Sequence, residues 1–456
     1  MKWKHLCIAL LLAAINFGVK FSFLDDSSFN LDEAYSVYYA QQDIPELSKI
    51  FEKEANPPTH FLLLHYWMDW FGISEIGTRS LSLLFSSLVM ALIYLIFKSR
   101  LKLFETLIIV VGFGFCDPLF FYGNEIRVHA ISAFAGVLSL FFLLNAVKRP
   151  NIKNLFLHGF SLTLLVYLHY ANSILIAVEG IIILSFIFKR AHIRFLWIYI
   201  LIILSIIPVA FWISGAKISS TSSWLTVPTL DSIWPMWVKL SNGIPWIGII
   251  FLTIICLGIL MVKGLTNKLI IAMPIFYLLL AFGISQYIPL FLERYLLIGA
   301  LLILFSAAYS ISFITSKTVR PILLIGSVLL LGFSFTSKTE KGEDWRGVNN
   351  YIKKYHAHAH VLVTPVFMYR PYLYYADQDE FITAGDILPR CFKKNTYFID
   401  LFGPELFDYI HPKELIYVSK NPNDLQNLLA LHELFIFQEE RWFEGLHLIV
   451  YQSRTP

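Results

Sequence analysis

The sequence predicts an α-helical polytopic membrane protein with about eleven transmembrane helices, followed by a small α/β domain. Three observations carry this fold class. Of the 456 residues, 57% are hydrophobic and only 15% are charged, whereas about one quarter are charged in soluble domains. Apolar runs of roughly 20 residues, the length that crosses a bilayer, recur along most of the chain. After about residue 337, charged residues return and the apolar runs become short.

The apolar runs and the basic residues together predict a topology. We expect spans near residues 5–24, 80–97, 103–122, 129–147, 155–171, 173–188, 195–213, 246–262, 269–288, 295–315 and 321–336. Lys and Arg gather in every second connection, and such connections face the cytoplasm. The amino terminus is therefore expected inside and the carboxy terminus outside. A cleaved signal peptide is the alternative for residues 1–24, and it leaves the next loop outside as well.

The predicted domain boundary lies at residue 336. Residues 1–336 form the membrane domain, whose first outer loop, 25–79, is broken by prolines and suits short helices along the membrane surface. Residues 337–456 form an extracytoplasmic α/β domain, with strands expected near 361–364, 397–400, 415–418 and 448–451 and a helix from Asp344 to about Lys354. The net charge of +4 is sorted by membrane side and gives no sign of nucleic-acid binding.

Metal-site and disulfide patterns are weak. His356, His358 and His360 have the period-two spacing of one strand face, where a solvated edge competes with a metal site. The four cysteines are widely spaced and show neither disulfide nor metal-site spacing. Glycine-rich nucleotide-binding motifs are absent from the sequence.

Asp32 and Glu33 are adjacent carboxylates a few residues after the first apolar span. A carboxylate at the membrane surface can act as a general base toward a hydroxyl acceptor. One base suffices when the leaving group is already a phosphate, unlike glycoside hydrolysis, which needs a second acid. Asp32 is the candidate base, with a helix-cap or loop acid as the alternative. Glu33 would orient the acceptor or a neighbouring basic group.

Other polar residues occupy the remaining outward connections. Arg127 and Arg294 lie near helix ends, and guanidinium matches a phosphate through its bidentate donors. The alternative is that each forms a structural ion pair, with Glu125 and with Glu293; Glu125 could also be a second functional carboxylate. His169 and Tyr170 could bind a sugar or phosphate, or simply pack. Further substrate-binding candidates are His60 and His65 beside Asn56-Pro57-Pro58, and Tyr295 beside Arg294. Glu179, inside an apolar span, needs an internal partner.

In order along the chain, Asp32-Glu33-Ala34, Asn56-Pro57-Pro58, Asn124-Glu125-Ile126-Arg127, His169-Tyr170 and Arg294-Tyr295 resemble glycosyltransferase family 39. This family has the GT-C fold and contains protein O-mannosyltransferases, with the lipid A aminoarabinose transferases close by. The resemblance covers residues 25–335 and Asp344-Trp345-Arg346, and it favours a bacterial-type enzyme.

The resemblance implies a polyprenyl-phosphate-linked sugar donor, a periplasmic cavity, and inverting transfer to a glycan, lipid or protein acceptor, with Asp32 as the base. A cell inner membrane location follows. We expect no cofactor, since arginines can neutralise the phosphate, although a divalent metal is not excluded. Two other classes stay open: a transporter or flippase for polyprenyl-linked glycans, whose inverted repeats are not evident here, and a non-catalytic assembly protein.

Overall fold

The computed structural model describes residues 3–51, 57–189, 196–215, 226–339, 341–383, 391–392, 395–400, 412–420 and 424–454. The chain divides into two compact units. The helical unit comprises Met1–Phe23, Ile44–Trp70 and Gly77–Lys338, and the mixed unit comprises Leu24–Asp43, Phe71–Ile76 and Thr339–Pro456. The first outer loop is thus shared between the units, whereas the sequence-based boundary at residue 336 left all of it with the membrane domain.

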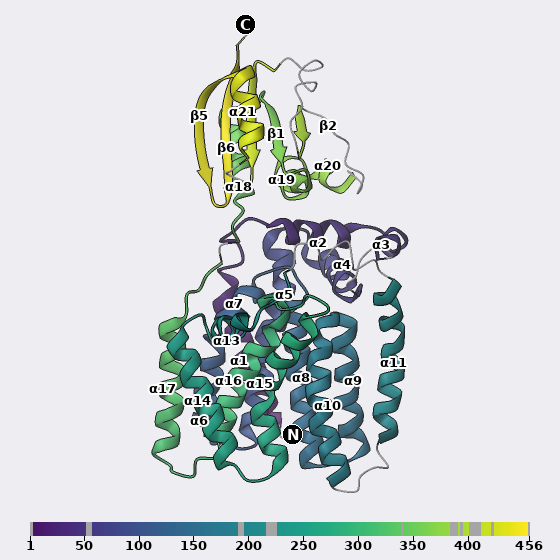
Figure 1. Ribbon diagram of the computed structural model, residues 1–456, viewed down its shortest axis with the longest axis vertical. Coiled ribbons are helices and arrows are strands. Elements are labelled where there is room, and N and C mark those ends of the chain that lie inside the picture. Colours follow the sequence, from purple (N-terminus) through teal and green to yellow (C-terminus); the bar gives the residue numbers. More distant parts are fainter. Residues whose placement is uncertain are drawn as a thin grey trace. The chain divides into compact units, whose positions relative to one another are not determined.

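Among the residues that the structure describes, five segments of the helical unit are long and apolar enough to cross a membrane (Figure 1). They are α1 (Trp3–Phe21), α5 (Glu75–Lys98), α8 (His129–Lys148), α15 (Leu265–Ser285) and Glu293–Ile311, which joins η4 (Glu293–Leu296) to α16 (Leu297–Ile311). Two bent pairs pass the same test together: α6 (Leu103–Gly114) with α7 (Asp117–Gly123), and Leu230–Leu240, which holds η3 (Leu230–Ser232) and α13 (Ile233–Leu240), with α14 (Pro245–Met261). The shorter apolar helices are α9 (Ile152–Leu168), α10 (Ser173–Lys189), α11 (Leu196–Gly215) and α17 (Val319–Ser334).

Every predicted span coincides with one of these helices or bent pairs, so the multi-span helical fold class is confirmed. Short helices also occupy the first outer loop, as expected: α2 (Leu31–Gln41), α3 (Ile44–Phe51) and α4 (Thr59–Phe71).

The bend between α6 and α7 has a local cause. Pro118 lies in the first turn of α7, where its missing N–H costs nothing. The broken backbone is satisfied by Asn242, whose Oδ1 accepts from the Asp117 amide at 3.0 Å and whose Nδ2 donates to the Phe115 carbonyl at 2.7 Å. A neighbouring side chain therefore replaces the helical hydrogen bonds that the bend removes.

Glu179 has the internal partner that its burial requires. Its Oε2 lies 2.8 Å from His158 Nε2, and its Oε1 accepts from Ser139 Oγ at 3.0 Å. His158 Nδ1 in turn lies 2.9 Å from the Tyr199 hydroxyl. The network joins α8, α9, α10 and α11, and both His158 and Glu179 are fully buried.

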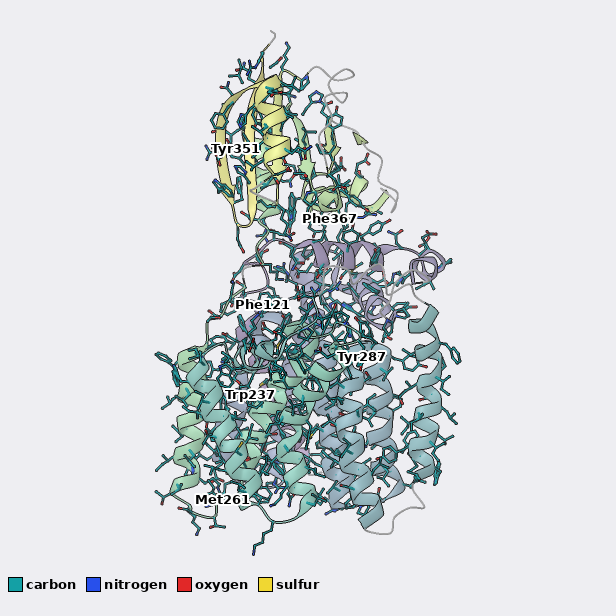
Figure 2. All side chains as sticks on the ribbon, in the orientation of Figure 1. Phe121, Trp237, Met261, Tyr287, Tyr351 and Phe367 are labelled. Atoms are coloured by element: carbon teal, nitrogen blue, oxygen red, sulfur yellow. The ribbon has the colours of Figure 1, made fainter. Side chains whose placement is uncertain are left out.

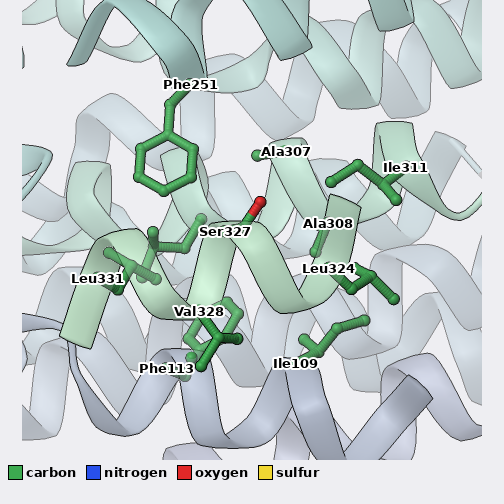
Figure 3. A pocket seen from close by; sticks show the side chains of 12 residues that line it. Ile109, Phe113, Phe251, Ala307, Ala308, Ile311, Leu324, Ser327, Val328 and Leu331 are labelled. Carbon is green, nitrogen blue, oxygen red and sulfur yellow. The ribbon is translucent and has the colours of Figure 1, made fainter. Parts of the chain in front are cut away.

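The outward surface of the helical unit carries large apolar side chains, as a bilayer requires. Met261, at the end of α14 (Figure 2), is one of them. Its side chain is 74% exposed, whereas that of Trp237 on α13 is buried. An apolar crevice of about 30 Å³ lies among α6, α14, α16 and α17 (Figure 3), and Ser327 supplies the one polar side chain of its lining. Such a lining offers no group for acid–base chemistry.

In the described part of the mixed unit, six strands form one sheet in the order β2-β3-β1-β4-β6-β5. Its strands are β1 (His360–Thr364), β2 (Cys391–Phe392), β3 (Thr396–Phe398), β4 (Glu414–Ser419), β5 (Phe435–Phe443) and β6 (Leu446–Ser453). β1 pairs in parallel with β3 and β4, and β6 pairs antiparallel with β4 and β5. Its helices are α18 (Trp345–Tyr355), α19 (Tyr369–Ala376), α20 (Gln378–Thr383) and α21 (Leu425–Leu434).

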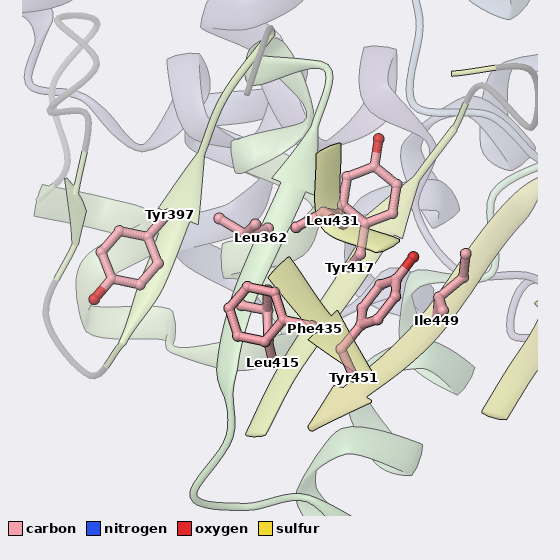
Figure 4. Packing of buried hydrophobic residues seen from close by; sticks show 8 residues of the cluster. All are labelled: Leu362, Tyr397, Leu415, Tyr417, Leu431, Phe435, Ile449 and Tyr451. Carbon is pink, nitrogen blue, oxygen red and sulfur yellow. The ribbon is translucent and has the colours of Figure 1, made fainter. Parts of the chain in front are cut away.

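An apolar cluster on this sheet includes Leu362, Tyr417 and Tyr451, with Leu431 from α21 (Figure 4). The sequence analysis missed β5, because Gln438, Glu439, Glu440 and Arg441 interrupt its apolar alternation. The prediction that His356, His358 and His360 share one strand face is wrong. His356 is the C-cap residue of α18, and of the three only His360 belongs to β1. Within the described ranges no group of three or more His, Cys, Asp or Glu could hold a metal ion.

Candidate functional site

Several of the predicted site residues lie at one end of the helical unit. This end is formed by the amino end of α8, the carboxy end of α9, η4 and the first turn of α4. Thr59 fixes α4 there, because its Oγ1 donates to the Tyr167 carbonyl at 2.5 Å. We call the group gathered here the Arg–His cluster; it comprises His60, Tyr122, Arg127, His129, His169, Tyr170, Arg294 and Tyr295.

Stacked aromatic rings hold one side of the Arg–His cluster. The His169 ring stacks on Tyr170 at a centroid distance of 4.5 Å and lies 4.9 Å from Tyr295. His169 Nδ1 accepts from the Ala171 amide at 3.1 Å, which directs Nε2 away from its own backbone. The Arg294 guanidinium lies 5.4 Å from the Tyr295 ring. The predicted His169, Tyr170, Arg294 and Tyr295 are therefore brought together.

The sequence analysis missed two members of the cluster, His129 and Tyr122. The buried His129 ring lies 6.0 Å from Tyr295, 6.2 Å from His169 and 5.4 Å from Tyr122. The available signal was its position, two residues after Arg127 at the start of an apolar span. A lone histidine at a helix start is common in packed cores, so that signal needed the fold to become informative.

Both arginines act on the same histidine. Arg127 and Arg294 each interact electrostatically with His129, and Arg127 also acts on His60. Glu125 is 5% exposed; it interacts with the Tyr122 hydroxyl, as does Arg294. Glu293 acts on the Tyr122 hydroxyl as well, so the cluster combines two guanidinium groups and two carboxylates with imidazole and phenol groups. The two guanidinium groups are the members that can hold an anion.

His60 is the buried imidazole of this cluster that sits outside the membrane spans. It is 4% exposed, and neither ring nitrogen has a hydrogen-bond partner among the residues that the structure describes. Burial, with the Arg127 charge and His169 adding to it, lowers the pKa of His60 to about 3. The ring is therefore neutral near pH 7 and keeps an N–H that a ligand oxygen can accept.

The lowered pKa of His60 predicts a loss of stability in acid. In the unfolded chain the imidazole titrates near 6.5, so His60 makes its full contribution to the free energy of unfolding above pH 6.5. This contribution falls as the pH drops from 6.5 toward 3, by up to about 1.4 kcal/mol per pH unit, because only the unfolded state binds the proton in that range. Melting temperatures between pH 7.5 and 4.5 should fall less steeply for His60→Gln than for wild type. His65→Gln is the matched control, and equal slopes for His60→Gln and wild type would contradict the assignment.

His65 faces another direction on α4. Five residues separate it from His60, which turns the side chains about 140° apart on a helix of 3.6 residues per turn. It is half-buried, and its ring lies 5.2 Å from that of the adjacent Tyr66. His65 is therefore not placed with the Arg–His cluster.

Asp32 and Glu33 belong to the mixed unit, at the amino end of α2. Asn30 caps this helix: its side chain accepts from the Glu33 amide at 2.9 Å, and the Glu33 carboxylate accepts from the Asn30 amide at 3.3 Å. Asp32 is half-buried in the first turn, where the positive end of the helix dipole favours a carboxylate. Glu33, rather than Asp32, thus provides the reciprocal cap.

Glu33 also forms a buried ion pair, with Lys341 Nζ 2.6 Å from its Oε1. Both side chains are almost completely buried. Next to it, Glu343 Oε2 accepts from the Leu31 amide at 2.9 Å and from Trp345 Nε1 at 3.0 Å. The start of α2 is therefore fastened to residues 341–345, which holds Asp32 in a fixed frame.

The Asp344-Trp345-Arg346 segment continues this attachment. Asp344 caps α18 by accepting from the Gly347 amide at 2.9 Å, as the sequence predicted for a helix starting here. Arg346 pairs with Asp25 at 3.0 Å and with Glu75. The motif therefore joins the carboxy-terminal residues to the two loop segments of the mixed unit.

The fold is similar to that of ArnT from Cupriavidus metallidurans. Its apo crystal structure superposes with a TM-score of 0.58 and 12% sequence identity, over 97% of each chain. A crystal structure of the same protein bound to undecaprenyl phosphate gives the same values. No family model matches the chain, and no curated protein does. The likeness shows that this chain shares the fold of ArnT, and it gives no support to glycosyltransferase family 39 specifically.

Proposed function

We propose that this chain is a membrane glycosyltransferase that moves a sugar from a polyprenyl-phosphate donor to a hydroxyl or phosphate acceptor, with inversion. The observation that carries the proposal is the Arg–His cluster, in which the Arg294 guanidinium lies 5.4 Å from the Tyr295 ring and the rings of His129 and His169 lie 6.0 and 4.9 Å from the same tyrosine. The Arg127 charge acts on His129 as well. A phosphate leaving group develops negative charge as the glycosidic bond breaks. Prepositioned guanidinium groups stabilise that charge without reorganising.

The neutral members of the cluster complement the arginines. A buried imidazole that stays uncharged, such as His60, donates a hydrogen bond to a phosphate or sugar oxygen without titrating near pH 7. Tyr170 and Tyr295 offer hydroxyls and ring faces beside His169. The undecaprenyl phosphate bound by the structurally similar ArnT supports a ligand of the same chemical class here.

The acceptor side of the reaction is assigned to Asp32. Its carboxylate would take the acceptor proton while that oxygen attacks the anomeric carbon, so that the bond to phosphate oxygen breaks as the new bond forms. Glu33, capped and paired with Lys341, would act as a positioning residue. Glu125 stays a candidate for a second functional carboxylate. By the basic-residue pattern, the reaction takes place on the periplasmic face of a bacterial inner membrane.

Charge removal from the cluster tests the donor assignment. Arg127→Gln and Arg294→Gln should each weaken binding of an undecaprenyl-phosphate-linked sugar roughly tenfold or more, since each removes charge-assisted hydrogen bonds. Arg149→Gln, which changes an exposed arginine at the other end of α8, is the control. The measurement is the donor affinity of each variant and of wild type in detergent micelles. Unchanged affinity in both cluster variants would contradict the phosphate assignment.

A further inference from the structure

We propose that the opposite end of the helical unit carries a second anion site, which binds the phosphate of an anionic phospholipid headgroup. A cavity of about 470 Å³ lies where α5, α8 and α16 end and α15 begins. α8 runs from the Arg–His cluster to Lys148, so its 20 residues separate the two sites by about 30 Å. The polar side chains of the cavity include Ser99, Arg100, Asn145, Lys148, Asn267 and Tyr309.

Arg100 is held in place within this cavity. Its Nη1 donates to the Tyr309 hydroxyl at 2.9 Å, and its guanidinium lies 4.2 Å from the Tyr309 ring and 4.8 Å from that of Phe313. The Tyr309 hydroxyl donates in turn to Asn267 Oδ1 at 3.1 Å. Tyr309 is 1% exposed, so a rigid buried residue positions the guanidinium. Arg100 itself is exposed, so its remaining guanidinium donors are accessible to a ligand.

The charge balance of the lining favours an anion. Arg100 and Lys148 are cationic, and no acidic residue belongs to the lining that the structure describes. Basic residues at helix ends alone would indicate only membrane orientation. Here they border a recess whose lining also includes the side-chain amides of Asn145 and Asn267, which a flat basic surface lacks. Asn267 lies in the first turn of α15, the helix end that favours negative charge.

The apolar part of the lining identifies the source of the phosphate. Leu95, Phe141, Leu144 and Ile270 line the same recess, beside the bilayer in which α5, α8 and α15 are expected to lie. A headgroup phosphate at the basic end, with its acyl chains along apolar side chains, satisfies both surfaces, and basic recesses between transmembrane helices bind headgroups in this way. This inference does not depend on sugar transfer.

The test measures lipid binding by the purified full-length chain with native mass spectrometry. Dioleoyl phosphatidylglycerol should bind in preference to dioleoyl phosphatidylcholine. Arg100→Gln/Lys148→Gln should weaken phosphatidylglycerol binding about fivefold for each charge removed. Lys317→Gln, at an exposed lysine outside the lining, is the matched control and should bind as wild type does. Tyr309→Phe removes the hydroxyl that accepts from Arg100 but keeps the ring, so it should also weaken phosphatidylglycerol binding. It replaces the double variant in the test if that variant fails to fold.

Competition with inorganic phosphate separates the two sources of the anion. If phosphatidylglycerol binds selectively, and the cavity variants weaken it while Lys317→Gln does not, the proposal holds. Equal binding of phosphatidylglycerol by wild type and the cavity variants overturns it. Inorganic phosphate that binds as tightly as the lipid, with the same dependence on Arg100, overturns the lipid assignment and makes the ligand a soluble phosphate.

Discussion

Asp32→Asn should lower the turnover of the polyprenyl-phosphate donor by about 10²- to 10⁴-fold, the usual contribution of a general base. Asparagine has nearly the same shape but cannot accept the acceptor's proton. Because Asn30 and Glu33 form the cap of α2 without Asp32, the helix should keep its structure. Donor affinity should also persist, since Arg127 and Arg294 are unchanged. The measurement is product formation per minute at saturating donor.

Asp26→Asn is the control for this variant, because it removes an exposed carboxylate from the same loop. It should turn the donor over at the wild-type rate. If Asp32→Asn retained full turnover, Asp32 would not be the base, and Glu125 would become the next candidate.

Glu33→Gln should act on stability instead. Glutamine can still accept from the Asn30 amide, so the cap survives. The variant removes the charge that faces Lys341, however, and leaves a buried ammonium group without its carboxylate. Removing one partner of a buried pair costs about 3–5 kcal/mol. Thermal unfolding and hydrogen exchange across residues 31–41 should both show the loss.

The double variant Glu33→Gln/Lys341→Met separates this electrostatic effect from a change of shape. Methionine removes the unpaired charge and fills a similar volume, so much of the lost stability should return. Equal stability of Glu33→Gln and wild type would show that the pair contributes little. Lost turnover with unchanged stability would instead assign Glu33 a part in the chemistry.

The sequence predicted the membrane fold well because its signals are local. A run of apolar residues is sufficient to identify an apolar helix, and each predicted span coincides with a helix or a bent pair of helices. Four of these helices are shorter than a span requires by length and composition. The Arg127, His169 and Tyr295 positions were also predicted, since polar groups at span ends stand out against apolar surroundings. Their mutual distances come from the packing of α8, α9 and η4, which no local pattern contains.

What was missed depends on contacts between distant segments. The Glu33 and Lys341 pair joins residues 308 positions apart, so neither the pairing nor the attachment of α2 to residues 341–345 could be inferred from either segment. His129 resembled a packing residue until Tyr122, His169 and Tyr295 were found around it. The β5 strand was hidden because its charged residues face solvent at the sheet edge.

The most direct test of the proposed function is donor consumption by the wild-type protein. The purified chain would be incubated with a panel of polyprenyl-phosphate-linked sugars and candidate acceptors, and mass spectrometry would follow free polyprenyl phosphate and glycosylated product. We predict that at least one donor is consumed, with both products appearing in equal amounts. Transfer to no acceptor, with every donor left intact or only moved across a membrane in vesicles, would contradict the glycosyltransferase assignment and favour a transporter.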